Sequence, residues 1–302
     1  QSANPPFIQA ASGDSDFLLS KTAEAFVGMA VSKHDGIPTA ISALVREIER
    51  ARKFGFTASE YARAKADYLR SLESAYNERD KMKNNQYVQE YVRHFIDNEP
   101  IPGIEMEYTL MNQLAPMITV EAINSILPQL VKDENIVINI FGPDKEGMVY
   151  PTEAEILDIL KNTKAEEITA YVDKVSDEPL MKETPKAGKI VKTEEGPFGS
   201  TALTLSNGVR VVIKNTDFKA DEIRMSAFSP GGTSVFGTKE ALQLKMLNSV
   251  AGLGGLGNFS NVDLEKVLAG KKASISTSVS GLTERIGGSC SPKDLETLMQ
   301  LV

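Results

Sequence analysis

The chain has 302 residues, of which 41% are hydrophobic and 25% charged, and its formal net charge is −8. This composition is ordinary for a globular protein and excludes the disordered and membrane classes, since no apolar run approaches the roughly 18 residues of a membrane-spanning helix. The acidic balance also argues against nucleic-acid binding, because such proteins need a cationic face to displace phosphate counterions.

The first part of the chain predicts strands followed by a helix. Residues 1–15 predict an extended entry segment, and residues 16–32, rich in Phe, Leu, Val and Ala, predict one or two strands. Gly36 and Pro38 then open a helix with an apolar stripe formed by Ile41, Leu44, Val45 and Ile48. Gly55 is well placed to end this helix, because glycine accepts the backbone conformation of a C-cap.

Two capping boxes mark the starts of later helices. In Thr57-Ala58-Ser59-Glu60 and in Thr152-Glu153-Ala154-Glu155, the Thr hydroxyl and the Glu carboxylate each satisfy a backbone amide of the first turn. The first of these helices is expected to pack one face against a sheet through Tyr61, Ala64, Tyr68, Leu72 and Ala75. Further helices are expected at residues 82–97 and 104–114, and after a cap at Thr119.

A short apolar run and a linker follow in the middle of the chain. Residues 135–141 are β-branched and almost uncharged, which is typical of a buried central strand. From residue 175 to residue 200, Pro and Gly alternate with Lys and Glu. Because such a segment buries little apolar surface, we predict a linker between two domains at residues 181–200.

The remaining residues predict three strands in quick succession. Asn207-Gly208 lies between two alternating runs, which is the strongest short signal for a hairpin with a type I′ turn. A third strand is predicted at residues 222–229, before Pro230-Gly231-Gly232. Beyond it we predict helices at residues 238–250 and 261–268, separated by a glycine-rich loop, and a serine-rich strand at residues 274–280.

This order of elements, with Gly-Gly-Thr-Ser after the third strand, resembles the opening of a domain in the insulinase/pitrilysin family of zinc metallopeptidases. A second resemblance is the segment from Glu47 to Glu60, which is similar to the inter-helix segment of the family's second domain. Catalytic domains of this family carry H-x-x-E-H, in which two His bind zinc and the Glu is the general base. The only histidines here are His34 and His94, so the chain contains no such motif.

The resemblance implies an α/β layered fold of the LuxS/mitochondrial-processing-peptidase type, with a mixed, mainly antiparallel sheet and helices on one face in each domain. It further implies that residues 1–180 are a complete second domain of the peptidase N-terminal half and that residues 181–200 are the linker. Residues 201–302 would be a truncated first domain of the non-catalytic C-terminal half. Since the chain starts at Gln1 and stops within a helical pattern, we expect it to be a piece of a longer protein.

By the same resemblance, the parent protein is a zinc-dependent metalloendopeptidase that encloses peptide or unfolded polypeptide substrates between its halves. Its zinc and its catalytic domain would lie upstream, and this chain would supply chamber wall and linker without activity of its own. We therefore assign no catalytic, cofactor-binding or metal-binding residue to it. The alternative is a structural or assembly relative of the family without peptidase activity, which the absence of H-x-x-E-H upstream would favour.

Several features invite a functional interpretation that their context does not support. Gly252–Gly257 matches the G-x-G-x-x-G of dinucleotide-binding loops, but a predicted helix precedes it, so dinucleotide binding is the weaker alternative. We expect His34 to be solvated, and the Glu90/His94 pair lacks a third metal ligand. The serines of residues 274–280 have no histidine nearby in the sequence that could activate them.

The single cysteine, Cys290, excludes an intrachain disulfide and leaves the redox compartment open. We predict it to be a small buried residue in a strand. The compartment is unassigned, with export to the periplasm expected only if a signal sequence lies upstream.

Overall fold

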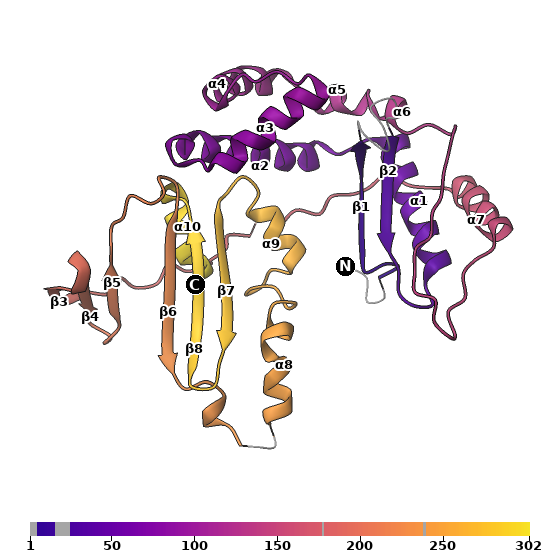
Figure 1. Ribbon diagram of the computed structural model, residues 1–302. Helices are drawn as coiled ribbons and strands as arrows, with labels where there is room; N and C mark the ends of the chain where they lie inside the picture. The colour runs from indigo at the N-terminus through magenta and orange to yellow at the C-terminus, as the bar shows by residue number, and fades with distance from the viewer. Residues whose placement is uncertain (1–4, 16–24, 177, 238–239) are drawn as a thin grey trace. The chain divides into compact units, whose positions relative to one another are not determined.

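The computed structural model describes residues 5–15, 25–176, 178–237 and 240–302 (Figure 1). Its contacts define two compact units. Unit 1 comprises Gln1–Lys65, Phe95–Glu99 and Met111–Lys174, and unit 2 comprises Ala66–His94, Pro100–Leu110 and Val175–Val302. Among the described residues all strand pairs are antiparallel and helices lie beside them, which confirms the predicted α/β layered fold.

Unit 1 holds a two-stranded sheet with helices around it. Its strands β1 (Gln9–Ser15) and β2 (Ala25–Val31) pair from Gln9↔Val31 to Ser15↔Ala25. The predicted strand at residues 16–32 is confirmed for β2, and residues 16–24 lie outside the described part of the chain. The helices are α1 (Ile37–Phe54), the start of α2 (Ala58–Asn77), α5 (Val120–Asn124), α6 (Leu127–Leu130) and α7 (Glu153–Ala165).

Helix α1 packs against both β2 and α7. A Cβ added to Gly28 of β2 would lie 2.9 Å from Cδ1 of Ile48, so helix and strand approach closely. The Ser42 and Thr163 hydroxyls lie 3.0 Å apart between α1 and α7. Because each contact joins residues distant in sequence, these packings hold unit 1 together.

The predicted helix ends in unit 1 are confirmed. α1 ends at Gly55, whose φ is 71°. Before α2, the Thr57 amide donates to the Glu60 carboxylate at 2.8 Å, and the Glu60 amide donates to the Thr57 hydroxyl at 3.2 Å. The second capping box, at Thr152 and Glu155, is formed in the same way, and at Thr119 the side-chain hydroxyl accepts from the Ala122 amide.

The central strand predicted at residues 135–141 is wrong. These residues form no strand within the described part of the chain, and the Val137 and Phe141 side chains are 79% and 91% exposed. Asn135 begins the run with a positive φ of 56°. β-branched composition favours extended backbone, but a place in a sheet also requires a partner strand, which composition does not specify.

Unit 2 holds two three-stranded sheets, with strand orders β3-β4-β5 and β6-β8-β7 (Figure 1). The strands are β3 (Ile190–Glu195), β4 (Thr201–Leu205), β5 (Arg210–Ile213), β6 (Ile223–Pro230), β7 (Ala273–Val279) and β8 (Thr283–Cys290). The helices are most of α2, α3 (Asn84–Asp97) and α4 (Ile104–Leu114), which both extend into unit 1, and α8 (Ala241–Ala251), α9 (Asn261–Val267) and α10 (Leu295–Leu301). Residues 238–239 of the predicted helix 238–250 lie outside the described residues. β3 lies within residues 181–200, which were predicted as a linker. That part of the predicted linker therefore forms a strand, which pairs with β4.

The hairpin predicted at Asn207-Gly208 forms, but its turn is not type I′. Gly208 has a φ of 87°, whereas Asn207 does not have the positive φ that a type I′ turn requires. The Gly208 amide donates to the Leu205 carbonyl at 2.9 Å, and the Asn207 side-chain oxygen accepts from the Val209 amide at 3.1 Å. The Asn207 side chain therefore stabilises a turn with a single left-handed residue.

Helix α10 covers one face of the second sheet. Leu298 of α10 is fully buried, and a Cβ added to Gly288 would lie 2.8 Å from Cδ1 of Leu298. The register places Met225 and Ile275 beside Gly288 on this face. Cys290 is 1% exposed at the end of β8, as predicted. This face is therefore the apolar core of the second sheet.

Candidate functional site

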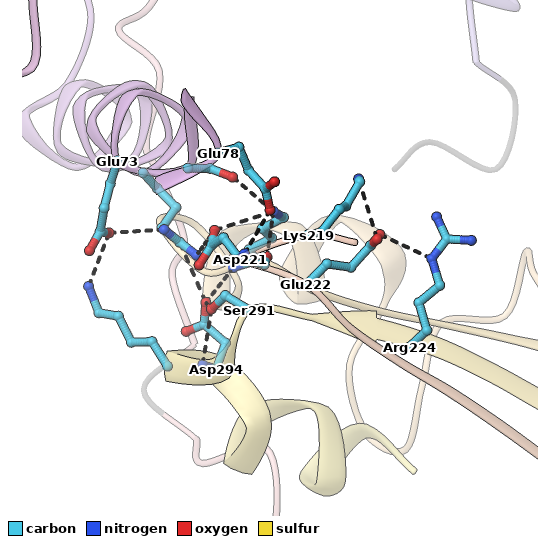
Figure 2. Close-up of polar contacts among 12 residues, drawn as sticks. Glu73, Glu78, Lys219, Asp221, Glu222, Arg224, Ser291 and Asp294 are labelled. Carbon is cyan, nitrogen blue, oxygen red and sulfur yellow. Dashed lines mark hydrogen bonds and ion pairs between the residues drawn. The ribbon is translucent and has the colours of Figure 1, made fainter. Parts of the chain in front are cut away.

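A buried group of charged side chains surrounds Arg70 in unit 2 (Figure 2). Its members come from α2 and the residue after it, from the segment before β6, from the start of β7 and from the turn before α10. Arg70 and Asp221 are only 7% and 4% exposed. We call this group the Arg70 cluster, and it consists of Arg70, Glu73, Ser74, Glu78, Asp221, Lys272, Ser291 and Asp294.

Helical spacing places the α2 members on one side of the helix. Arg70 and Glu73 are three residues apart, and Arg70 and Ser74 are four apart, so their side chains lie on the same face. Asp67, one turn earlier, accepts a hydrogen bond from the Gly270 amide at 2.6 Å. This polar face of α2 therefore contacts the loop before β7 as well as the cluster.

Arg70 contacts three carboxylates from different parts of the chain. Its Nη1 donates to Glu73 at 3.0 Å, and its Nη2 donates to Asp221 at 3.1 Å. Its Nε lies 3.6 Å from Asp294 and has no hydrogen-bond partner within the described residues. A guanidinium suits this place because it presents several donors in a fixed plane and stays charged when buried.

Lys272 is the second cation of the cluster. Its Nζ donates to the Ser74 hydroxyl at 2.8 Å and to the Asp221 carbonyl at 2.9 Å, and lies 3.3 Å from the Asp221 carboxylate. Its backbone amide donates to Asp294 at 2.9 Å, and the Ser291 hydroxyl donates to the same oxygen at 2.7 Å. Lys272 thus links the start of β7 to both α2 and the start of α10.

Asp221 is held in its ionised form. Burial by itself raises the pKa of Asp221, but the hydrogen bond from Ser74 and the charges of Arg70 and Lys272 outweigh it, so the pKa lies below the ordinary 3.8. Because folding depresses the pKa of Asp221, the ionised carboxylate stabilises the folded protein above pH 3.8. This contribution to the free energy of unfolding is lost as the pH falls further, through the depressed pKa. At neutral pH the carboxylate therefore accepts from its partners in full.

The arrangement positions chain segments. Its carboxylates accept from cations and backbone amides, and neither histidine nor cysteine belongs to the cluster. The Asp221 amide in turn donates to Glu78 at 2.7 Å. A continuation visible in Figure 2 runs from Lys219 through Glu222 to Arg224. The cluster therefore fastens α2 to the starts of β6, β7 and α10.

The other residues singled out in the sequence lie apart from this cluster. His34 is exposed before α1, and Glu90 and His94 lie on α3. Across residues 5–15, 25–176, 178–237 and 240–302, no group of three or more His, Cys, Asp or Glu is arranged to hold a metal ion. Gly252–Gly257 lies between α8 and α9, so a helix precedes the loop, as predicted.

No pattern in the sequence indicates the Arg70 cluster, because Arg70 and Asp221 are 151 residues apart. The spacing of apolar residues in α2 predicted that its apolar face, and not its polar face, would pack against the rest of the protein. Leu72 is buried, but Tyr68 is exposed, and the polar side of the helix is the one that buries Arg70. Polar side chains at helical spacing on a helix are more often exposed to solvent than buried. Only the fold shows that the polar face of α2 is buried.

Comparisons with known proteins agree with the resemblance found in the sequence, although no family model matches the chain. A "zinc protease PQQL-like" protein of Arabidopsis thaliana is 30% identical over 224 residues, or 74% of this chain. The "probable zinc protease PqqL" of Escherichia coli (strain K12) is 23% identical over 275 residues, or 90% of this chain. This chain belongs to the insulinase/pitrilysin family. The crystal structure of pitrilysin shares the fold, with a TM-score of 0.54 at 13% identity over 97% of this chain and 30% of that one.

The chain corresponds to a fraction of each family member that it matches. It spans 23% of the Arabidopsis protein and 29% of the Escherichia coli protein. Within the described residues, no helix is both long and apolar enough to cross a membrane.

Proposed function

We propose that the protein to which this chain belongs is a zinc-dependent metalloendopeptidase and that this chain is a non-catalytic part of it. The observation that carries the proposal is the 30% identity over 224 residues to a protein named a zinc protease, of which the chain spans 23%. The chain has two histidines and no H-x-x-E-H. The zinc ligands and the general base would therefore come from residues outside it.

The residues that the structure describes do not form a site for a zinc ion. Zinc sites in enzymes use at least three protein ligands drawn from His, Cys, Asp and Glu. In the part of the chain that the structure describes, no such group is assembled, and the Asp221 and Asp294 carboxylates accept hydrogen bonds from Arg70 and from the Lys272 amide. No chemical step is therefore assigned to a metal bound by this chain.

The role left to the chain is structural, as part of the wall around a peptide or unfolded polypeptide substrate. In this proposal residues 1–180 are the second domain of the catalytic half, residues 181–200 are the linker, and residues 201–302 begin the other half. The Arg70 cluster supports a fixed geometry near the linker, because it joins α2 to residues that follow the linker. The partner implied for this chain is the catalytic domain of the same protein.

The proposal predicts the behaviour of the full-length protein in a cleavage assay. We expect it to cut an unstructured, fluorescently labelled polypeptide, to lose this activity to a chelator and to regain it with added zinc. We expect no cleavage by residues 1–302 alone.

The same assay tests the structural alternative. A full-length protein without cleavage, and without H-x-x-E-H in its sequence, would support a structural or assembly relative. Cleavage that resists the chelator would contradict the zinc mechanism directly.

A further inference from the structure

The second sheet of unit 2 has one face that α10 does not cover. Because side chains alternate along a strand, residues Arg224, Ser226 and Phe228 of β6 lie on the face opposite to Met225 and the α10 core. Arg224 and Phe228 are 76% and 73% exposed. We call this surface the open face of the sheet.

The register arranges the open face in four rows across the strands, and the last, Pro230 opposite Thr283, lies where the pairing ends. Arg224 lies opposite Ser289 in the first row, and Phe228 lies opposite Arg285 in the third. Between them, Ser226, Gly287 and Ser276 form a row of small residues. A shallow hollow of about 450 Å³ lies over the first two rows.

The charge of the open face has one sign, although the chain as a whole is acidic. Arg224 and Arg285 are its charged residues, and Glu284 points to the other face, where it accepts from the Ser229 hydroxyl. Arg224 Nε contacts Glu222, at 3.2 Å, but that carboxylate also contacts Lys219 and precedes the strand. The open face is therefore complementary to a ligand that carries carboxylates.

The small middle row determines the shape of such a ligand. Gly287 has no side chain, and the Ser276 hydroxyl lies 3.1 Å from the position that a Cβ there would take, so this row carries only small groups. The exposed hydroxyls of Ser226 and Ser276 offer donors and acceptors to peptide groups. Four residues separate the two charged rows along a strand, or roughly 13 Å.

We propose that the open face binds an extended, acidic polypeptide segment that runs along the strands and places carboxylates four residues apart against Arg224 and Arg285. Phe228 would add an apolar contact beside Arg285. The inference deepens the proposed function, on which it rests, by naming the surface of this chain that a polypeptide substrate contacts.

The test is a binding titration of this chain with a fluorescein-labelled peptide rich in Gly, Ser and Thr that carries two Glu four residues apart. The comparison peptides carry two Lys at the same positions, or two Glu three residues apart, which face opposite sides of an extended chain. We expect the matched acidic peptide to bind most tightly, and Arg285→Gln to weaken its binding about fivefold. Arg224→Gln should act in the same direction, and added salt should weaken binding.

The matched control is Arg210→Gln, which removes an exposed arginine from β5 in the other sheet and should leave binding unchanged. Equal binding of the acidic and basic peptides, absence of binding, or an equal effect of Arg210→Gln and Arg285→Gln would overturn the proposal. Because binding is measured without cleavage, the two proposals fail separately. A full-length protein that cleaves polypeptides, with a chain that fails to bind the acidic peptide, would refute the inference and leave the proposed function standing.

Discussion

Replacing Arg70 with methionine is expected to lower the free energy of unfolding of unit 2 by about 3–5 kcal/mol. Methionine has a similar reach but no charge, so Asp221 and Asp294 would remain buried without the cation that they share. When one partner of a buried ionic group is removed, the free energy of unfolding falls by more than the intact group contributes to it, because the remaining charge stays buried without a partner. The loss should therefore be far larger than for an exposed arginine.

Cys290 provides a local measurement of this effect. It is the only cysteine, it is 1% exposed, and burial together with the charge of Asp294 raises the pKa of its thiol, so it should react slowly until unit 2 opens. We would follow labelling of Cys290 against urea concentration for the wild type, Arg70→Met and the exposed control Arg210→Met. Adding Asp221→Asn to Arg70→Met should recover part of the loss, because it leaves one buried carboxylate fewer for Lys272 alone to balance. Equal urea midpoints for Arg70→Met and Arg210→Met would show that the cluster does not hold unit 2 together.

Replacing Leu298 with alanine is the second change with a large expected effect. Leu298 is fully buried in α10, and its Cδ1 occupies the space left by the missing side chain of Gly288. Because β8 cannot move to fill the cavity without leaving its two neighbouring strands, we expect a loss of about 3–5 kcal/mol in the free energy of unfolding.

The neighbouring Met299 provides the control for this prediction. Met299 is 46% exposed on the same helix, so Met299→Ala changes side-chain size without opening a buried cavity. Its expected effect, measured by the same Cys290 labelling in urea, is about 0.5 kcal/mol. If the two alanine variants unfold at the same urea concentration, then α10 does not pack on the second sheet in solution as described.

Local signals in the sequence predicted the ends of elements well. Gly55, Thr57 and Thr152 act on backbone groups within a few residues of themselves, so their roles follow from the sequence alone. Strands β4 to β7 were predicted for the same reason, because alternation along a strand is a local pattern. The fold class then followed from the order of these elements and from the family resemblance.

Features that depend on distant partners were not predicted. Residues 135–141 have the composition of a central strand, yet within the described residues they pair with none. The Arg70 cluster brings together residues from α2, from the segments before β6 and β7 and from the turn before α10, and nothing near Arg70 in the sequence indicates Asp221 or Asp294. The type of the Asn207-Gly208 turn was also not predicted, although the turn is local. The Asn207 side chain accepts a hydrogen bond from the Val209 amide, and the dipeptide alone does not indicate this contact.

We proposed that this chain is a non-catalytic part of a zinc peptidase, and the first measurement to make is the zinc content of the purified chain. Elemental analysis of the purified chain after dialysis, divided by protein concentration, should give a zinc content near zero, because no group of three metal ligands is assembled within the described residues. A ratio near one zinc per chain would show that this chain binds the metal itself, contrary to the proposed function. It would mean that His34 or His94, together with carboxylates assigned here to ion pairs, builds a metal site.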